Sequence, residues 1–389
     1  MIALHAARAV AGERILEDAW VTLEGERIAA VGDAPPPGAR RIELGEVDLV
    51  PGAIDLHSDC LETLAHPRPS AHIPLEAALY DLDALVLAHG ITTNYLCISL
   101  DDDAAKHRYD ERAIETEATL RRIRPALRSE YRIHLRVDVT RDSSDLMRGM
   151  LEGGLVALVS YMDHTPGQGQ YPEEADWRAF YNSRAGASEE FVEQRLDAKR
   201  SGQRRAEAMR EQIAALAAEY GAALASHDDD SPAAIERAER LGVAISEFPV
   251  NAEAAAVAIA RGLGVVMGAP NARRGRSHVT NLSAREALAN GTLDALASDY
   301  HPPSMFGAAY ALAADGACAL PRALALVTSG PARIAGLRDR GEIAPGMRAD
   351  IAAIERRDAY PIVRQTWIAG RPALGFDRTL LFEQEVLAP

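Results

Sequence analysis

The stretch Val50–Glu62 reads VPGAIDLHSDCLE, an apolar strand-like run that leads into His57 and Asp59. Alternate residues of a β-strand point to the same side, so these two side chains face the same way at the end of the strand. An imidazole and a carboxylate placed like this present a nitrogen and an oxygen donor at a fixed separation. The stretch therefore predicts a strand that ends in a binding site.

Seven similar segments, rich in β-branched residues, follow along the chain, and Ala- and Leu-rich helical stretches separate most of them. The eight predicted strands lie in residues 52–59, 90–98, 131–139, 155–164, 221–230, 242–250, 264–270 and 294–300. Eight strands alternating with helices are typical of the α/β class and predict a TIM-like (β/α)8 barrel. We expect residues 51–340 to form this barrel.

The two ends of the chain have a different character, with short alternating strands and Gly- and Pro-rich turns. Residues 1–50 and 341–389 are predicted to pair in one small β-sandwich domain. Within the sequence segment predicted to form the barrel, the polar residues 167–187 are a candidate lid over the active site, although an ordinary surface loop is the commoner alternative. The longest helical stretch, 188–221, is predicted to end at Gly221.

Composition narrows the class of protein. Hydrophobic residues make up 48% of the 389 positions and charged residues 25%, and no window resembles a membrane span or a signal peptide. We expect a cytoplasmic protein. The formal net charge of −15 argues against nucleic acid as a partner, because phosphate backbones are held by broad basic surfaces. The sequence leaves open whether the chain forms a homo-oligomer.

In such a barrel the active site lies at the carboxyl ends of the strands, so polar residues there are the informative ones. One histidine in such a place is more often an ordinary polar residue than a ligand, but five strands carry donors of the right type. They are His57, Asp59, Asp138, Asp163, His164, His227, Asp228, Asp229, Asp230 and Asp299. Imidazole and carboxylate suit one or two divalent ions, and they do not distinguish zinc, manganese and iron.

A basic run follows the seventh strand, in MGAPNARRGRSH, residues 267–278. The loops after the seventh and eighth strands of such barrels often bind phosphate. Arg68, held between two prolines just after the first strand, is a further candidate for a phosphate contact, or equally a residue of a structural turn. The candidate substrate-binding residues are Arg68, Asn271, Arg274, Arg276 and His278.

Several of these segments resemble those of a known protein superfamily. The chain resembles the amidohydrolase superfamily in PGAIDLH and GEIAPGMRADIAAI, and it is similar to the PhnM family of phosphonate-pathway diphosphatases. The runs SYMDHTPGQGQY, LASHDD, MGAPNARRGRSH and SDYHPPS, spread in order along the barrel segment, carry the second resemblance. It implies hydrolysis of α-D-ribose 1-methylphosphonate 5-triphosphate to the 5-phosphate and pyrophosphate, with a small polyphosphorylated ribosyl phosphonate as the partner.

The resemblance also implies metal-binding and catalytic roles for individual residues. The metal ligands would be His57, Asp59, Asp138, His164, His227 and Asp299. Asp299 would either bind metal or take the proton of the attacking water, and Asp299 and His227 are the candidate catalytic residues. Asp163, Asp228 and Asp229 would orient the metal-binding histidines without binding the metal themselves. Glu62 and Glu247 are weaker candidates.

The chain departs from the family at several positions. Family members generally have Asn where this chain has Cys60, Glu where it has Asp138, Gly where it has Arg276 and an aromatic residue where it has His301. These differences leave two alternatives open. One is a related hydrolase of an amide or cyclic amide, whose pocket would lack the arginine run; the other is a non-catalytic binding subunit of a phosphonate-degrading assembly.

Overall fold

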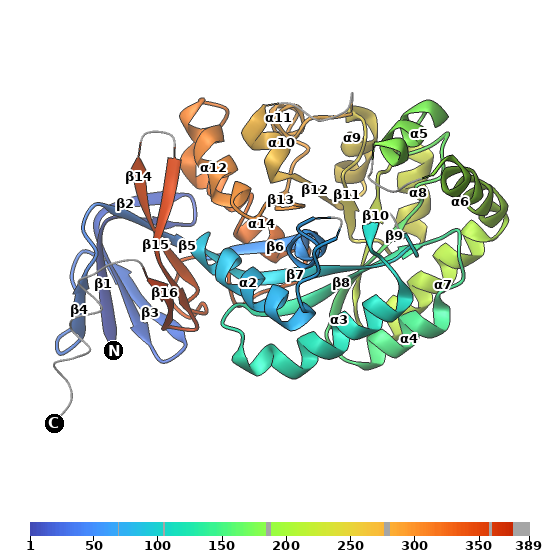
Figure 1. The fold of residues 1–389 in the computed structure, drawn as a ribbon. Coiled ribbons are helices and arrows are strands. Elements are labelled where there is room, and N and C mark those ends of the chain that lie inside the picture. Colours follow the sequence, from blue (N-terminus) through green and yellow to red (C-terminus); the bar gives the residue numbers. More distant parts are fainter. Residues whose placement is uncertain (69, 104–105, 184–187, 276–280, 358–359, 376–389) are drawn as a thin grey trace.

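The computed structural model describes residues 1–375 apart from 69, 104–105, 184–187, 276–280 and 358–359, and residues 376–389 also lie outside the described part. A β sheet forms one side of the molecule and a barrel with its helices the other (Figure 1). None of the described helices is both long and apolar enough to cross a membrane.

Eight parallel strands form the barrel, in the order in which they occur in the chain. They are β6 (Ala53–Ser58), β7 (Ile91–Leu100), β8 (Glu130–Asp138), β9 (Val156–Met162), β10 (Ala223–His227), β11 (Ile245–Glu247), β12 (Gly264–Gly268) and β13 (Ala295–Ala297). All eight overlap the predicted segments, with β7 ending two residues beyond its segment and β8 beginning one residue before its segment, and the predicted fold class is confirmed. Several strands, such as β7 and β12, are buried along their whole length, as expected of a parallel sheet covered by helices.

The barrel closes where its first and last strands meet. Asp59 N donates to Asp299 O at 2.7 Å, and Asp299 N donates to His57 O at 2.9 Å. Small and branched side chains fill the lumen, among them Ile54, Leu158 and Val266. The carboxyl ends of β6 and β13 are thus joined at the residues that were expected to begin and complete the site.

Helices cover the outside of the barrel. They are α2 (Leu75–Ala88), α3 (Asp110–Ile123), α4 (Ser144–Glu152), α7 (Ala206–Glu219), α8 (Pro232–Arg240), α9 (Ala252–Ala260), α11 (Ala284–Ala289), α12 (Ser304–Ala314), α13 (Leu320–Ala325) and α14 (Ser329–Ile334). Additional elements lie in the connections: α1 (Leu61–Ala65), η2 (Arg124–Ala126), α5 (Glu174–Asn182), α6 (Glu189–Gly202), η3 (Gln203–Arg205) and α10 (Ala269–Arg274).

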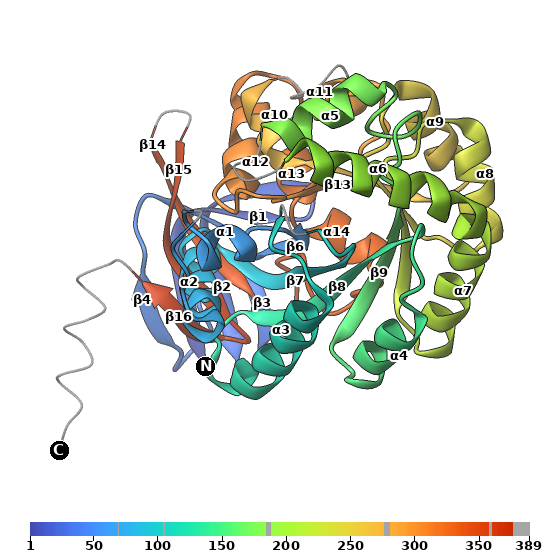
Figure 2. The same ribbon diagram turned by 45° about the vertical axis from the view of Figure 1, so that its right-hand side comes forward.

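The helical stretch predicted over 188–221 is interrupted in the structure. It consists of α6, the short η3 and α7, which ends before Gly221 with its positive φ of 69°. At the end of α6, Gly202 lies so close to the chain after β8 that a Cβ atom at this position would be 2.1 Å from the Thr140 carbonyl oxygen. α6 therefore packs directly against the chain that follows β8 and lies across the barrel (Figure 2).

Both termini contribute to the second sheet, which is mostly antiparallel. Its strands are β1 (Ile2–Ala11), β2 (Arg14–Glu24), β3 (Arg27–Gly32), β4 (Arg40–Glu43), β5 (Val47–Pro51), β14 (Ile351–Arg357), β15 (Tyr360–Ile368) and β16 (Arg371–Gly375). The antiparallel pair of β5 and β14 joins the two ends of the chain. That residues 1–50 and 341–389 make a domain separable from residues 51–340 stays a prediction.

Glu130, the first residue of β8, ties the barrel to the chain that returns to this sheet. Its carboxylate accepts a hydrogen bond from Arg340 Nη1 at 2.7 Å and pairs with Arg348. Burial alone would raise the pKa of Glu130, but the two guanidinium groups hold it at about 2.

We expect Glu130→Gln to lower the free energy of unfolding by about 1–2 kcal/mol at neutral pH, because charge-assisted hydrogen bonds contribute roughly that much. A depressed pKa stabilises the folded state above the unfolded value of 4.5, and this contribution is lost as the pH falls through about 2. Urea unfolding of both proteins at successively lower pH measures the difference, which should shrink below the unfolded value. A difference independent of pH would contradict this account.

Candidate active site

A pocket of about 400 Å³ opens at the carboxyl ends of the barrel strands. Side chains from most of the strand ends and from the insertion before α6 line it. They include His57, Asp59, Lys106, Arg108, Arg136, His164, Tyr171, Phe180, His227, Asp228, Phe248, Asn271, Asn281 and Asp299. Of the residues named from the sequence, His57, Asp59, His164, His227, Asp228, Asn271 and Asp299 line this pocket.

The first set of donors lies where the barrel closes and consists of His57, Asp59 and Asp299. One ligand atom from each lies within 4.8 Å of the others. His57 and Asp59 share a face of the strand end, as their spacing predicts. Asp299 has a φ of 55°, a conformation that non-glycine residues adopt at a cost, and the two backbone hydrogen bonds to β6 hold it there.

A second set is formed by His164, His227 and Asp228. Asp228 Oδ2 lies 3.0 Å from His227 Nδ1 and 3.5 Å from His164 Nε2. Asp228 Oδ2 and His227 Nδ1 are buried, and apart from these short contacts with one another and with His164 they have no hydrogen bond of good geometry with the described residues. Buried polar atoms are rarely left unsatisfied, so three converging donors of this kind fit a divalent cation.

Glu247, a weaker candidate in the sequence, lies between the two sets. Its Oε1 is 3.2 Å from His57 Nδ1, and His57, His227 and Glu247 form a further group of donors within 4.8 Å. Its exposed fraction is 0%, and its position on β11 opposes β10. The carboxylate therefore orients His57 and joins the two sets into one polar centre.

Burial and neighbouring charges shift the pKa values of several of these groups. Burial lowers the pKa of His164 to about 4, and burial with Arg136 lowers that of His57, so both rings are neutral at pH 7. Burial would raise the pKa of Asp228, but His227 and His164 hold it well below its usual range. Burial and the Asp59 carboxylate raise the pKa of Asp299 to about 7, which suits a group that exchanges a proton near neutral pH.

Cationic side chains that the sequence analysis missed form one wall of the pocket. Arg108 Nη2 donates to both oxygens of Asp59 at 2.7 and 2.9 Å, and Arg136 Nη1 donates to Asp59 Oδ2 at 2.9 Å. Arg136 Nη2 lies 3.2 Å from His227 Nε2. Strand alternation was the available signal, since Arg136 precedes Asp138 by two residues and shares its face of β8.

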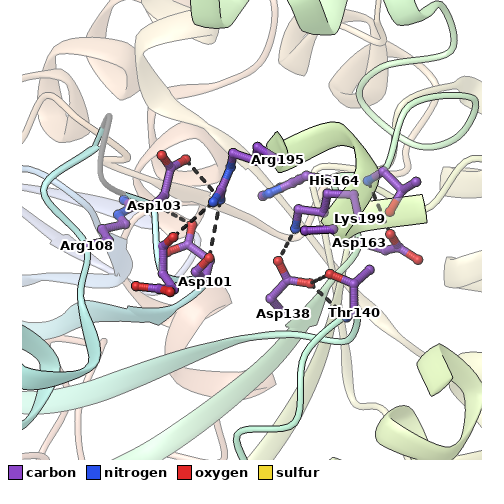
Figure 3. Close-up of polar contacts among 12 residues, drawn as sticks. Asp101, Asp103, Arg108, Asp138, Thr140, Asp163, His164, Arg195 and Lys199 are labelled. Carbon is purple, nitrogen blue, oxygen red and sulfur yellow. Dashed lines mark hydrogen bonds and ion pairs between the residues drawn. The ribbon is translucent and has the colours of Figure 1, made fainter. Parts of the chain in front are cut away.

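The structure does not bring Asp138 into either set of donors among the described residues. Its Oδ1 accepts hydrogen bonds from Thr140 N at 2.8 Å and Thr140 Oγ1 at 2.6 Å, and its Oδ2 pairs with Lys199 of α6. Figure 3 shows Lys199 pointing from α6 to this carboxylate. Asp138 thus fastens α6 to the end of β8.

We expect Asp138→Asn to destabilise the protein by about 3 kcal/mol, because removing one partner of a buried ion pair leaves the other charge uncompensated. Metal content, measured by elemental mass spectrometry after gel filtration, should not change. Loss of metal with unchanged thermal stability would instead identify Asp138 as a ligand.

The three aspartates that were expected to orient the histidines have different partners in the structure. Asp163 accepts hydrogen bonds from Gln203 Nε2 at 2.9 Å and Arg210 Nη2 at 2.8 Å, which link it to η3 and α7. Asp229 Oδ2 accepts hydrogen bonds from Ser226 and Ser246 at 2.6 Å each, which link β10 to β11. Asp228, in contrast, reaches the histidines directly.

The predicted substrate-binding residues are dispersed. Asn271 lines the pocket, and its Oδ1 is buried without a hydrogen-bond partner among the described residues. Arg274 is exposed, with Nη1 3.4 Å from the hydroxyl of Tyr300, which lines the pocket. Arg68 is exposed in a turn closed by Ala71 N and Arg68 O. Arg276 and His278 lie outside the described residues.

Comparisons with known proteins agree on the family. Residues 189–373 match the amidohydrolase family. The α-D-ribose 1-methylphosphonate 5-triphosphate diphosphatase of Escherichia coli strain K12 is 36% identical over 329 residues, which cover 83% of this chain and 87% of that protein.

Solved structures show the same fold at low identity. N-acetyl-D-glucosamine-6-phosphate deacetylase from Mycobacterium smegmatis has a TM-score of 0.63 at 17% identity and covers 96% of this chain and 100% of its own. A Xaa-Pro dipeptidase with bound methionine has a TM-score of 0.64 at 12% identity, with coverages of 96% and 100%. At these identities the likeness concerns the fold alone.

Proposed function

Because the chain belongs to the amidohydrolase superfamily, and within it to the family of the ribose 1-methylphosphonate 5-triphosphate diphosphatase, we propose that it is a metal-dependent diphosphatase of phosphonate catabolism. Its substrate would be α-D-ribose 1-methylphosphonate 5-triphosphate. The products would be the 5-phosphate and pyrophosphate. The observation that carries the proposal is the 36% identity to that diphosphatase over most of both chains.

The two sets of donors would hold the cofactor, one or two divalent ions: His57, Asp59 and Asp299 on one side, and His164, His227 and Asp228 on the other. A divalent ion bound there supplies a Lewis acid that neutralises phosphoryl oxygens and acidifies water.

The chain's own residues account for the remaining chemistry. Hydrolysis adds a water oxygen to one phosphorus of the anhydride, while the bridging oxygen leaves with the other phosphorus. Asp299, with its raised pKa, accepts the proton of that water at a carboxylate oxygen. Lys106, Arg108 and Arg136 line the same pocket and reduce the repulsion between the acidic donor groups and a polyanionic substrate.

Phosphorus NMR of the manganese- or zinc-loaded protein tests the proposal. Release of pyrophosphate from the ribosyl triphosphate, and not from a nucleoside triphosphate, is the expected result. No release from either compound by metal-replete protein would contradict the proposal and favour the alternatives of an amide hydrolase or a binding subunit. Turnover of an amide or cyclic amide would then separate those two.

A further inference from the structure

The chain uses lysine at only two positions, although it has 42 lysine and arginine residues in total. The two lysines have different surroundings. Lys199, on α6, is buried and paired with Asp138. Lys106, in the loop between β7 and α3, lines the pocket.

The ammonium group of Lys106 is held loosely. It lies 3.7 Å from Asp103 Oδ2, beyond a hydrogen bond, and 5.2 Å from the centre of the Phe180 ring. Its side chain is only 17% exposed. Burial and the neighbouring Arg108 lower the pKa of Lys106 to about 8, so the group is still mostly charged at pH 7 but poorly solvated. Such a cation gains from an anionic ligand.

Asp103 has other partners that would remain if Lys106 moved. Tyr181 donates its hydroxyl hydrogen to Asp103 Oδ2 at 2.8 Å, and Arg195 Nη2 lies 3.2 Å from the same oxygen. Figure 3 shows Arg195 reaching from α6 between Asp101 and Asp103. The two arginines of the cationic wall, in contrast, are fixed by hydrogen bonds to Asp59. Lys106 is therefore the cation of this wall that can turn to a ligand at the lowest cost.

The pocket has two unlike sides. Lys106, Arg108 and Arg136 come from β8 and the loop after β7. Phe248, Met267 and Leu282 come from β12 and the segments after β11 and β12. In the strand order of the barrel these are opposite sides. The amide groups of Asn271 and Asn281 lie on the second side, which has the apolar and neutral polar groups that suit a sugar.

We propose that Lys106 binds the terminal phosphates of the substrate, so that the pyrophosphate leaves on the side of β7 and β8 while the ribosyl group lies against the side of β11 and β12. This orientation rests on the proposed function. Lys106 would then make the site specific for substrates that end in at least two linked phosphate groups. Phe180 limits the space around its ammonium group.

Calorimetry with pyrophosphate and the full, manganese-loaded chain measures this subsite without turnover. Lys106→Ala should weaken pyrophosphate binding at least tenfold, because a poorly solvated charge contact is removed. Lys106→Arg should retain the affinity within about threefold. Arg122→Ala removes an exposed cation of α3 that pairs with Glu76, and it should leave the affinity unchanged. Equal affinities of Lys106→Ala and the unaltered protein would overturn the proposal.

The scarcity of lysine permits a second test on the unaltered protein. An amine-directed acetylating ester can modify only Lys106, Lys199 and the chain's amino terminus. Pyrophosphate should slow acetylation of Lys106 at least fivefold, followed by peptide mass spectrometry, and leave the amino terminus unaffected. Lack of protection at saturating pyrophosphate would also overturn the proposal.

The two proposals can fail separately. If pyrophosphate protects Lys106 from acetylation but the ribosyl triphosphate is not hydrolysed, the pyrophosphate subsite is supported and the proposed substrate is wrong. Hydrolysis of the ribosyl triphosphate with unchanged pyrophosphate affinity of Lys106→Ala would keep the diphosphatase and discard the role of Lys106.

Discussion

Replacing His227 by alanine is expected to lower kcat/KM for the ribosyl triphosphate by on the order of a thousandfold. His227 belongs to two of the donor groups and lies within 3.2 Å of Arg136. Its loss would remove a ligand and leave Asp228 Oδ2, buried and already without a hydrogen bond among the described residues, beside His164 alone. Metal content should fall together with activity.

The control for His227→Ala is His72→Ala, which removes an exposed imidazole that belongs to none of the donor groups found among the described residues. It should change neither metal content nor kcat/KM. Circular dichroism should show that both variants are folded. A folded His227→Ala variant with full metal content and full activity would remove this residue from the site.

Asp299→Asn is the second change with a large expected effect. The amide keeps the shape of the side chain but cannot accept the proton of an attacking water, so kcat should fall by about 10² to 10⁴. The backbone hydrogen bonds that hold residue 299 against β6 do not involve the carboxylate. The barrel should therefore close as before, and the melting temperature should stay near that of the unaltered protein.

Metal analysis of Asp299→Asn separates the two roles that the sequence leaves open. Full metal content with reduced kcat and unchanged KM would identify Asp299 as the proton acceptor. Loss of metal would identify it as a ligand, since it belongs to the donor group with His57 and Asp59. A variant with normal kcat and normal metal content would contradict both roles.

Much of the architecture could be predicted because it depends on local patterns. Buried parallel strands read as continuous apolar runs, and the donors at their ends are adjacent in the sequence to those runs. His57, His164, His227 and Asp299 were found in this way, and the structure gathers them around one pocket. The close approach of Gly202 at the end of α6 to Thr140 involves a residue of another segment, and no local pattern indicates it.

The functions of individual carboxylates could not be predicted in the same way, because contacts distant in sequence decide them. Asp138 ends a strand as His227 does, but Lys199 of α6 and the neighbouring Thr140 engage both its oxygens. Asp228 follows a candidate ligand in the chain, yet its positive φ of 57° turns its carboxylate toward His227 and His164. Arginines such as Arg108 and Arg136 are hard to single out in a chain with so many.

The hydrogen bonds between residue 299 and β6 also bear on how the protein is made. His57 and Asp59 leave the ribosome early, but their partner Asp299 is synthesised near the end of the barrel segment. The donor group His57, Asp59 and Asp299 therefore cannot exist on a nascent chain until the last strand has been translated and has docked beside the first. Loop closure over this length is slow, so acquisition of the complete site should coincide with the final, long-range step of folding.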